Sequence, residues 1–250
     1  MNRLLALVVV ASLGTGCIVS DTCEVRTVRI TWDSFLRADG STTSSCAVAS
    51  LGASAEAEII DVWIDGVYDG SAYCDGRDGG RFWDVFDVGP GRHNVTVEAR
   101  DVDDFITLRD EFSFDAPDAC GDLQVDSQPA EGWVSVNYNF YDGAVLANPN
   151  ACVTGSSLWL QITDDIAEQP AYSITSTTAG TPACTASRNL RLPLAIGDYT
   201  FDWLEERSGS TLESSACTAQ RFTPGKSFSV GRAATTAMTV ALDTIGPACH

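Results

Sequence analysis

The sequence contains little of what catalytic and metal sites are usually made from. Only two histidines occur, His93 and His250, and no two cysteines form a Cys-x-x-Cys pair. A zinc site built from histidine and cysteine is therefore weakly supported. The Gly-x-Ser-x-Gly elbow of serine hydrolases, a glycine-rich phosphate loop and a dinucleotide fingerprint are also missing. We expect no cofactor and assign no catalytic residue.

Basic residues are also scarce, because 15 Lys and Arg stand against 34 Asp and Glu, which gives a net charge of −19. Such a field repels nucleic acid and anionic membrane surfaces, so neither is an expected partner through charge. Long 3.6-residue periodicity is absent beyond the N-terminal stretch, whereas short alternating stretches between Gly, Pro, Asp and Ser clusters are common. That spacing is typical of an all-β fold.

The N-terminal stretch has the features of a secretory signal. Asn2 and Arg3 precede an apolar run at 4–13, and small residues at 14–16 lead to Cys17. The run is too short to cross a bilayer, which takes roughly 20 residues. A charged start, an apolar stretch and a small-residue exit predict a signal peptide over 1–16. The alternative is a buried N-terminal helix or strand, which the abrupt polarity of residues 18–24 disfavours.

The sequence LGTG at 13–16, followed by Cys17, resembles a bacterial lipoprotein signal. Gly14 departs from that family, which usually has Leu there. The resemblance implies that Cys17 carries acyl chains, that residues 17–23 form a tether, and that the membrane is a partner through this anchor. Ile18, in place of Asp, favours the outer membrane of the cell envelope. Ordinary secretion or a periplasmic location is the alternative.

The number of cysteines agrees with this division of roles. The chain has nine cysteines, an odd number, and removal of Cys17 leaves eight. An even set in an exported protein predicts a disulfide framework. The eight are Cys23, Cys46, Cys74, Cys120, Cys152, Cys184, Cys217 and Cys249.

An internal repeat organises the chain. An offset of 106 residues places VRITWDSFLRADG (28–40) on VSVNYNFYDGAVL (134–146) and GRHNVTVEARD (91–101) on GDYTFDWLEER (197–207). The same offset places Cys46 on Cys152, a short insertion places Cys74 on Cys184, and VWID (62–65) resembles LWLQ (158–161). We therefore predict two related β-sandwich domains, over 24–122 and 123–250, each of ordinary domain size.

Two of these stretches resemble Ig-like surface modules of bacterial envelope proteins, of the PEGA and transthyretin-like types. WIDG (63–66) is similar to their strand ending in an Asp-Gly turn, and VGPGRHNVTVEARD (88–101) is similar to a later strand. The literal Pro-Glu-Gly-Ala motif is absent. The resemblance implies tandem Ig-like β-sandwiches, and a fold of this kind does not specify a function.

The repeat also predicts disulfide pairs. Cys46 with Cys74 and Cys152 with Cys184 stand at matched places in the two units, so each pair is expected to form one bridge inside its domain. The other four have no partner by repeat. Assignment by domain pairs Cys23 with Cys120 and Cys217 with Cys249, although connectivity cannot be deduced from sequence alone.

Few residues qualify as a binding site. Trp63 and Trp159 alternate with apolar neighbours, so each is predicted on the outer face of a strand, where it could stack on a sugar or anchor a protein. The favoured interpretation is nevertheless that a loop or the other domain covers them. DGRDGG (75–80) and DVDD (101–104) could offer oxygens to calcium, but plain Asx turns are the favoured interpretation. His93 is interpreted as a packed residue rather than a general base.

These observations favour a non-enzymatic envelope lipoprotein with a structural or protein-binding role. The expected partners are an envelope protein or a surface glycan. The alternatives are a calcium- or carbohydrate-binding adhesion module, and a hydrolase whose site carries no known motif.

Overall fold

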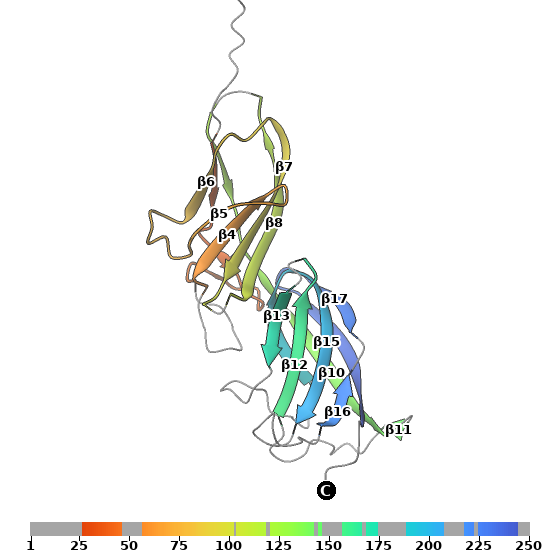
Figure 1. Ribbon diagram of the computed structural model, residues 1–250. Coiled ribbons are helices and arrows are strands. Elements are labelled where there is room, and N and C mark those ends of the chain that lie inside the picture. The colour runs from red at the N-terminus through yellow and green to blue at the C-terminus, as the bar shows by residue number, and fades with distance from the viewer. Residues whose placement is uncertain are drawn as a thin grey trace, which may run out of the picture.

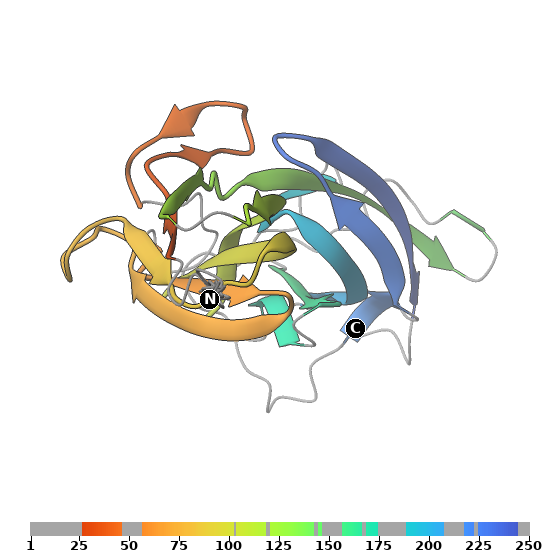
Figure 2. The same ribbon diagram turned by 90° about the horizontal axis from the view of Figure 1, so that it is seen from above.

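The fold comes from a computed structural model that describes residues 27–46, 57–102, 104–118, 121–142, 145–146, 157–166, 169–174, 189–207, 218–222 and 225–244. Every regular element in these ranges is a β-strand, so the predicted all-β class is confirmed. The strands form two units that follow one another along the molecule (Figure 1). Seen from above, the red and orange strands of the first unit and the blue strands of the second occupy opposite sides (Figure 2).

The first unit is a sandwich of two sheets. One has the order β6-β1-β9, with β1 parallel to β9, and the other has the order β5-β4-β7-β8. The strands β2 and β3 form a small hairpin beside them. The bounds are β1 (Val28–Thr31), β2 (Phe35–Leu36), β3 (Thr42–Thr43), β4 (Ile59–Ile64), β5 (Val67–Tyr73), β6 (Phe82–Val85), β7 (Gly91–Arg100), β8 (Ile106–Ala116) and β9 (Leu123–Asp126).

Alternation along the strands builds the core of this unit. Val28 and Ile30 point inward from β1, and both are fully buried against the inward residues of the facing sheet, such as Val62. Each such side chain contributes about 1.5–3 kcal/mol of transfer free energy on burial. The predicted disulfide between Cys46 and Cys74 is present, with 6.0 Å between the two Cα atoms. The other seven cysteines lie outside the described residues.

The second unit repeats this strand order. The set β14-β10-β18 corresponds to β6-β1-β9, with β10 again parallel to β18, and β13-β12-β15-β17 corresponds to β5-β4-β7-β8. The strand β16 pairs with both β15 and β18 and joins the two layers. The bounds are β10 (Glu131–Asp142), β11 (Val145–Leu146), β12 (Ser157–Asp164), β13 (Gln169–Ile174), β14 (Asn189–Ala195), β15 (Gly197–Arg207), β16 (Thr218–Phe222), β17 (Lys226–Val230) and β18 (Thr235–Thr244).

The pairing differs from the sequence expectation in two details. The strand β9 follows residue 122, where the second domain was expected to begin, yet it pairs with β1 of the first unit. The correspondence of VWID with LWLQ is wrong in register. Trp63 lies opposite Thr96, whose counterpart at the 106-residue offset is Asp202. Trp159, however, lies opposite Glu205, three residues further along the chain. A bulge between Gln161 and Ile162 in the second unit accounts for part of the offset, because it adds a residue to one strand.

A buried ion cluster connects the two units. Arg109 on β8 is fully buried and donates from Nε to Glu98 Oε1 (3.0 Å) and from Nη2 to Asp164 Oδ2 (2.7 Å) in the second unit. It also donates to the carbonyl oxygen of Ile196 (3.3 Å). A side chain at Gly197 would meet this guanidinium, since a Cβ there would lie 2.4 Å from Nη1. The guanidinium therefore ties the end of β12 to the middle of β8.

Two further carboxylates support the junction. Asp110 on β8 pairs with Arg232 of the second unit and accepts from the backbone N–H of Gln128 (2.7 Å). Glu131 at the start of β10 accepts from the backbone N–H of Ala38 (3.2 Å) and lies 3.7 Å from Arg37 Nη1. Because buried charges that have partners tolerate little displacement, these contacts fix the orientation of one unit relative to the other.

Candidate binding groove

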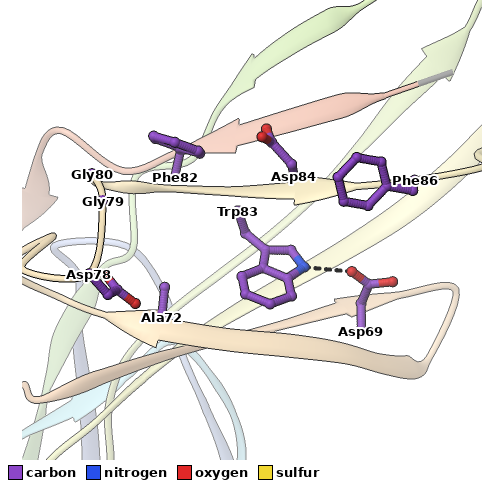
Figure 3. Close-up of a pocket in the computed structure, with 9 residues that line it drawn as sticks. All are labelled: Asp69, Ala72, Asp78, Gly79, Gly80, Phe82, Trp83, Asp84 and Phe86. Carbon is purple, nitrogen blue, oxygen red and sulfur yellow. Dashed lines mark hydrogen bonds between the residues drawn. The ribbon is translucent and has the colours of Figure 1, made fainter.

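A groove runs along one open side of the first sandwich, where the edge strands β5 and β6 of the two sheets lie side by side (Figure 3). Its volume is about 480 Å³. Three aromatic residues, three aspartates and small residues line it. They are Asp69, Ala72, Asp78, Gly79, Gly80, Phe82, Trp83, Asp84 and Phe86.

Trp83 forms the floor of the groove. Its side chain leaves β6 toward β5, and its indole Nε1–H donates to Asp69 Oδ2 at 2.5 Å (Figure 3). The ring packs directly on the backbone of Gly70, where an added Cβ would lie 2.1 Å from Trp83 Cζ2. Only glycine permits this approach, so the pair of Gly70 and Trp83 sets the separation between the two edge strands.

The turn that joins β5 to β6 forms one end of the groove. Asp78 Oδ2 accepts from the backbone N–H of Tyr73 (3.3 Å), and Asp75 Oδ1 accepts from that of Arg77 (3.1 Å). Phe82 packs over Gly80, where a Cβ would lie 2.5 Å from the ring. The acidic stretch at 75–80 thus acts locally as a turn.

The outer wall carries a charge pair. Phe82 and Asp84 leave β6 on the side opposite Trp83 (Figure 3). Asp84 accepts two hydrogen bonds from Arg29 (2.7 and 2.8 Å), and these hold the pKa of Asp84 below its usual range. The same guanidinium lies over the Phe82 ring, 3.9 Å from its centroid. Arg29 therefore neutralises Asp84 but forms no ion pair with Asp69 or Asp78, the other two aspartates of the lining.

The remaining two aspartates of the groove have only neutral donors. Asp69 accepts from the Trp83 indole and Asp78 from a backbone N–H, and neither forms an ion pair with a described residue. None of the nine lining residues is Lys, Arg, His, Asn, Gln, Ser or Thr. The Trp83 N–H is already used. The groove therefore presents hydrogen-bond acceptors and aromatic faces, and almost no side-chain donors.

The outer edge of β6 pairs with no other described strand. Trp32 N donates to Arg81 O (3.2 Å), so these two residues form a hydrogen-bonded pair. Hydrogen-bonded and non-hydrogen-bonded pairs alternate along two antiparallel strands, and the next hydrogen-bonded pair between β1 and β6 is therefore Ile30 with Trp83. The backbone N–H and C=O groups of Phe82 and Asp84 therefore point away from β1, toward the free edge. They form no backbone hydrogen bond with another described residue.

The two tryptophans predicted as binding residues are not in this groove. Trp63 is half-buried on the outer face of β4, with its ring edge-on to Tyr68 at 5.2 Å between centroids. Its Nε1 is buried and has no hydrogen-bond partner among the described residues. The side chain of Trp159, like Cys17 and its neighbours, lies outside the described residues.

His93 is held on both sides of its ring. Nδ1 is 2.7 Å from Asp65 Oδ2, Nε2 is 2.9 Å from Gly89 O, and the ring stacks on Phe114 at 5.5 Å between centroids. Hydrogen bonds from the backbone N–H of Asn94 and from His93 hold the pKa of Asp65 below its usual range. Both ring nitrogens are engaged, which agrees with the interpretation of His93 as a packed residue.

The acidic stretch at 101–104 also serves a turn. Asp101 Oδ1 accepts from the backbone N–H of Phe105 (3.0 Å), and Asp104 lies 3.5 Å from Arg100 Nη1. Among the described residues, no group of three or more His, Cys, Asp or Glu is placed to hold a metal ion. The same part of the chain contains no helix long and apolar enough to span a membrane.

Sequence reasoning missed Trp83, Phe82 and Phe86, although a signal was there. The stretch RFWDVFDV at 81–88 places three aromatic residues within five positions and follows directly on Gly79 and Gly80. What the sequence did not provide was the position of the neighbouring edge strand β5, because that depends on the pairing of the whole sandwich.

The sequence matches no protein-family model and no curated protein. Solved structures found by the structural comparison include a leucine-rich repeat protein from Bacteroides thetaiotaomicron, with 13% identity over 89% of this chain and 27% of that chain and a TM-score of 0.29. They also include the TIE protein of Bacillus anthracis, with 8% identity over 89% of this chain and 34% of that chain and a TM-score of 0.30. The minor pilin GBS52 of Streptococcus agalactiae matches with 9% identity over 90% of this chain and 98% of the pilin chain, with a TM-score of 0.39. This chain spans only 27% and 34% of the first two proteins. At these TM-scores the superpositions say nothing about function.

Proposed function

We propose that this chain is a non-enzymatic protein of the cell envelope that binds a partner through the groove between β5 and β6. The observation that carries the proposal is the groove itself, in which Trp83, Phe82 and Phe86 line an open side of the first sandwich beside two aspartates that have no cationic partner in the described part of the chain. Aromatic side chains of this kind are the residues that most often anchor interfaces.

The groove is attached to a rigid support. Cys74 directly follows β5, and its disulfide to Cys46 holds this strand to the rest of the unit. The buried indole of Trp32 donates to the carbonyl oxygen of Cys74 (3.3 Å) from the core side. A site on braced strands loses little conformational entropy when it binds, which raises affinity for a given contact area.

The envelope location is part of the proposal and depends on Cys17. The N-terminal signal and its resemblance to lipoprotein signals support an acyl anchor on Cys17. The net charge of −19 supports solubility next to a membrane without adhesion to its anionic surface. The chemistry of the described residues supports a role in binding rather than in catalysis, since His93 is fixed by two hydrogen bonds.

Ligand arrays with a groove variant test this proposal. The purified protein is applied to arrayed peptides and arrayed glycans, together with Trp83→Leu. Leucine is compatible with the fold at this position, because Leu190 of β14 occupies the matching register opposite β10 in the second unit. Trp63→Leu serves as the matched control outside the groove. We expect ligands whose binding is lost in Trp83→Leu and kept in Trp63→Leu. Ligands that ignore Trp83, or no ligand on either array, would contradict the proposal.

A further inference from the structure

We infer that the occupant of this groove is an extended segment of a protein partner that carries an arginine or lysine and adds to the free edge of β6. The inference rests on the proposed function and names the class of ligand for the same site. Three properties of the groove support it: a free strand edge, a lining with almost no side-chain donors, and two carboxylates that have no cationic partner among the described residues.

The free edge supplies the register for an added strand. The backbone groups of Phe82 and Asp84 point outward from β6 and form no backbone hydrogen bond with another described residue. An extended peptide can form main-chain hydrogen bonds to such an edge and place alternate side chains toward the sandwich. With side chains on alternating faces, every second residue of the added segment would face Trp83 and the wall formed by β5.

The shortage of donors disfavours a sugar. Each sugar hydroxyl is both a donor and an acceptor, and sites for neutral glycans usually offer both in return. The side chains here offer carboxylates and aromatic faces, while the Trp83 N–H is occupied by Asp69. A guanidinium or an ammonium group has only donors to satisfy, so an acceptor-rich groove complements it.

The charges have the matching sign. Asp69 and Asp78 project from opposite ends of the groove and have no described ion-pair partner. A cationic side chain between them would also lie on the faces of Trp83 and Phe86, where cation–π attraction adds to the ionic contact. Phe86 is 65% exposed, which leaves its face available. The overall charge of −19 would speed the approach of a cationic segment.

The matching strand of the second unit, β14, which the structure describes, lacks these features. In the register opposite β10, Asn189 and Leu190 stand where the first unit has Phe82 and Trp83. Pro193 follows where Phe86 would be, and proline has no N–H to offer an added strand. The inferred site therefore belongs to the first unit alone, although both units share one strand order.

Peptides in one β-prone host test the inference. Nine-residue peptides that differ only at the centre (Arg, Lys, Gln or Glu) are titrated into the full chain by calorimetry. An N-methylated copy of the Arg peptide removes alternate backbone donors. L-Arginine amide and arrayed neutral glycans are tested in parallel. We expect Arg and Lys peptides to bind at least tenfold more tightly than Gln, no binding of Glu, and at least a tenfold loss on N-methylation.

Isosteric variants locate the contact. Asp69→Asn and Asp78→Asn keep an oxygen acceptor for the Trp83 indole and the Tyr73 N–H but remove the charge, and each should weaken the Arg peptide at least tenfold. Asp75→Asn is the matched control, because Asp75 belongs to the same turn but does not line the groove. Loss of affinity in the control equal to that of the groove variants would overturn the inference.

The remaining outcomes separate the inference from the proposed function. Binding of L-arginine amide as tight as the peptide would overturn strand addition. Glycan binding that depends on Trp83, without peptide binding, would overturn the inference and leave the proposed function intact. Failure of every peptide and every glycan to depend on Trp83 would overturn both.

Discussion

Replacement of Arg109 by Met should destabilise the protein far more than any surface substitution. The methionine has a comparable length and no charge, so it removes the guanidinium that lies between the buried carboxylates of Glu98 and Asp164, while Glu98 keeps its ion pair with Arg100 (3.0 Å). Arg109 and Asp164 are fully buried, and the Glu98 side chain is 5% exposed. The Arg109 guanidinium contacts both carboxylates, because its Nη2 lies 2.8 Å from Glu98 Oε1 and 2.7 Å from Asp164 Oδ2.

The magnitude follows from burial. Removal of one partner from a buried ion pair costs about 3–5 kcal/mol, because a charge remains in a medium that solvates it poorly. For a chain of this size, each kcal/mol lowers the midpoint of thermal unfolding by about 2–4 °C, so a decrease of roughly 6–20 °C is expected. The loss of the hydrogen bond to Ile196 O (3.3 Å) adds an unsatisfied carbonyl to this cost.

Urea unfolding at neutral pH, followed by tryptophan fluorescence, measures the effect. Arg29→Met is the matched control, since its pair with Asp84 lies at the surface, where the Arg29 side chain is 45% exposed and such pairs contribute about 0–1 kcal/mol. The triple variant Arg109→Met, Glu98→Gln, Asp164→Asn also removes the two carboxylate charges that Arg109 contacts and should recover part of the loss. If Arg109→Met and Arg29→Met prove equally stable, the buried cluster does not hold the junction and the reasoning is wrong.

Three further perturbations give distinct results. Replacement of both Cys46 and Cys74 by Ser should lower the free energy of unfolding by about 3–4 kcal/mol, since the bridge closes a loop of 28 residues. Urea unfolding under oxidising conditions measures this change, and a decrease of less than about 1 kcal/mol would refute the expectation. Burial raises the pKa of Glu131 above its usual 4.5, so the folded state holds this proton more tightly than the unfolded state does. The contribution of Glu131 to stability therefore declines as the pH rises from about 4.5 through the raised pKa of the folded state. Glu131→Gln should flatten this part of the profile of melting temperature against pH, and identical profiles for the two proteins would contradict the assignment. Cys17→Ser should move the protein from the membrane fraction to the soluble fraction, and unchanged partitioning would rule out the acyl anchor.

Periodicity carried most of the fold prediction. Val28 and Ile30 alternate with polar residues, and both are fully buried, as are their repeat counterparts Val134 and Val136. The disulfide between Cys46 and Cys74 followed from the repeat in the same way. Patterns of this kind depend on short-range geometry, in which side chains alternate between the two faces of a strand, so a single sequence is enough to predict them.

The groove and the junction needed the three-dimensional arrangement. Arg109 and Asp164 are 55 residues apart, and nothing local marks either as the partner of the other. In the sequence Trp83 is one aromatic residue among several, and only the pairing of β6 with β1 places it beside Gly70 of the opposite sheet. The prediction centred instead on Trp63, because alternation identifies the outer face of a strand but not which sheet edge remains open.

Hydrogen exchange at the amides of Phe82 and Asp84 tests the central claim most directly. Both N–H groups point to the free edge of β6, so they should exchange quickly in the unbound protein and become protected when the Arg-centred peptide is added. The amide of Trp83, which faces β1, should change little. Protection of Phe82 and Asp84 at saturating peptide is the predicted result, and unchanged exchange of both amides while the peptide is bound would contradict the account.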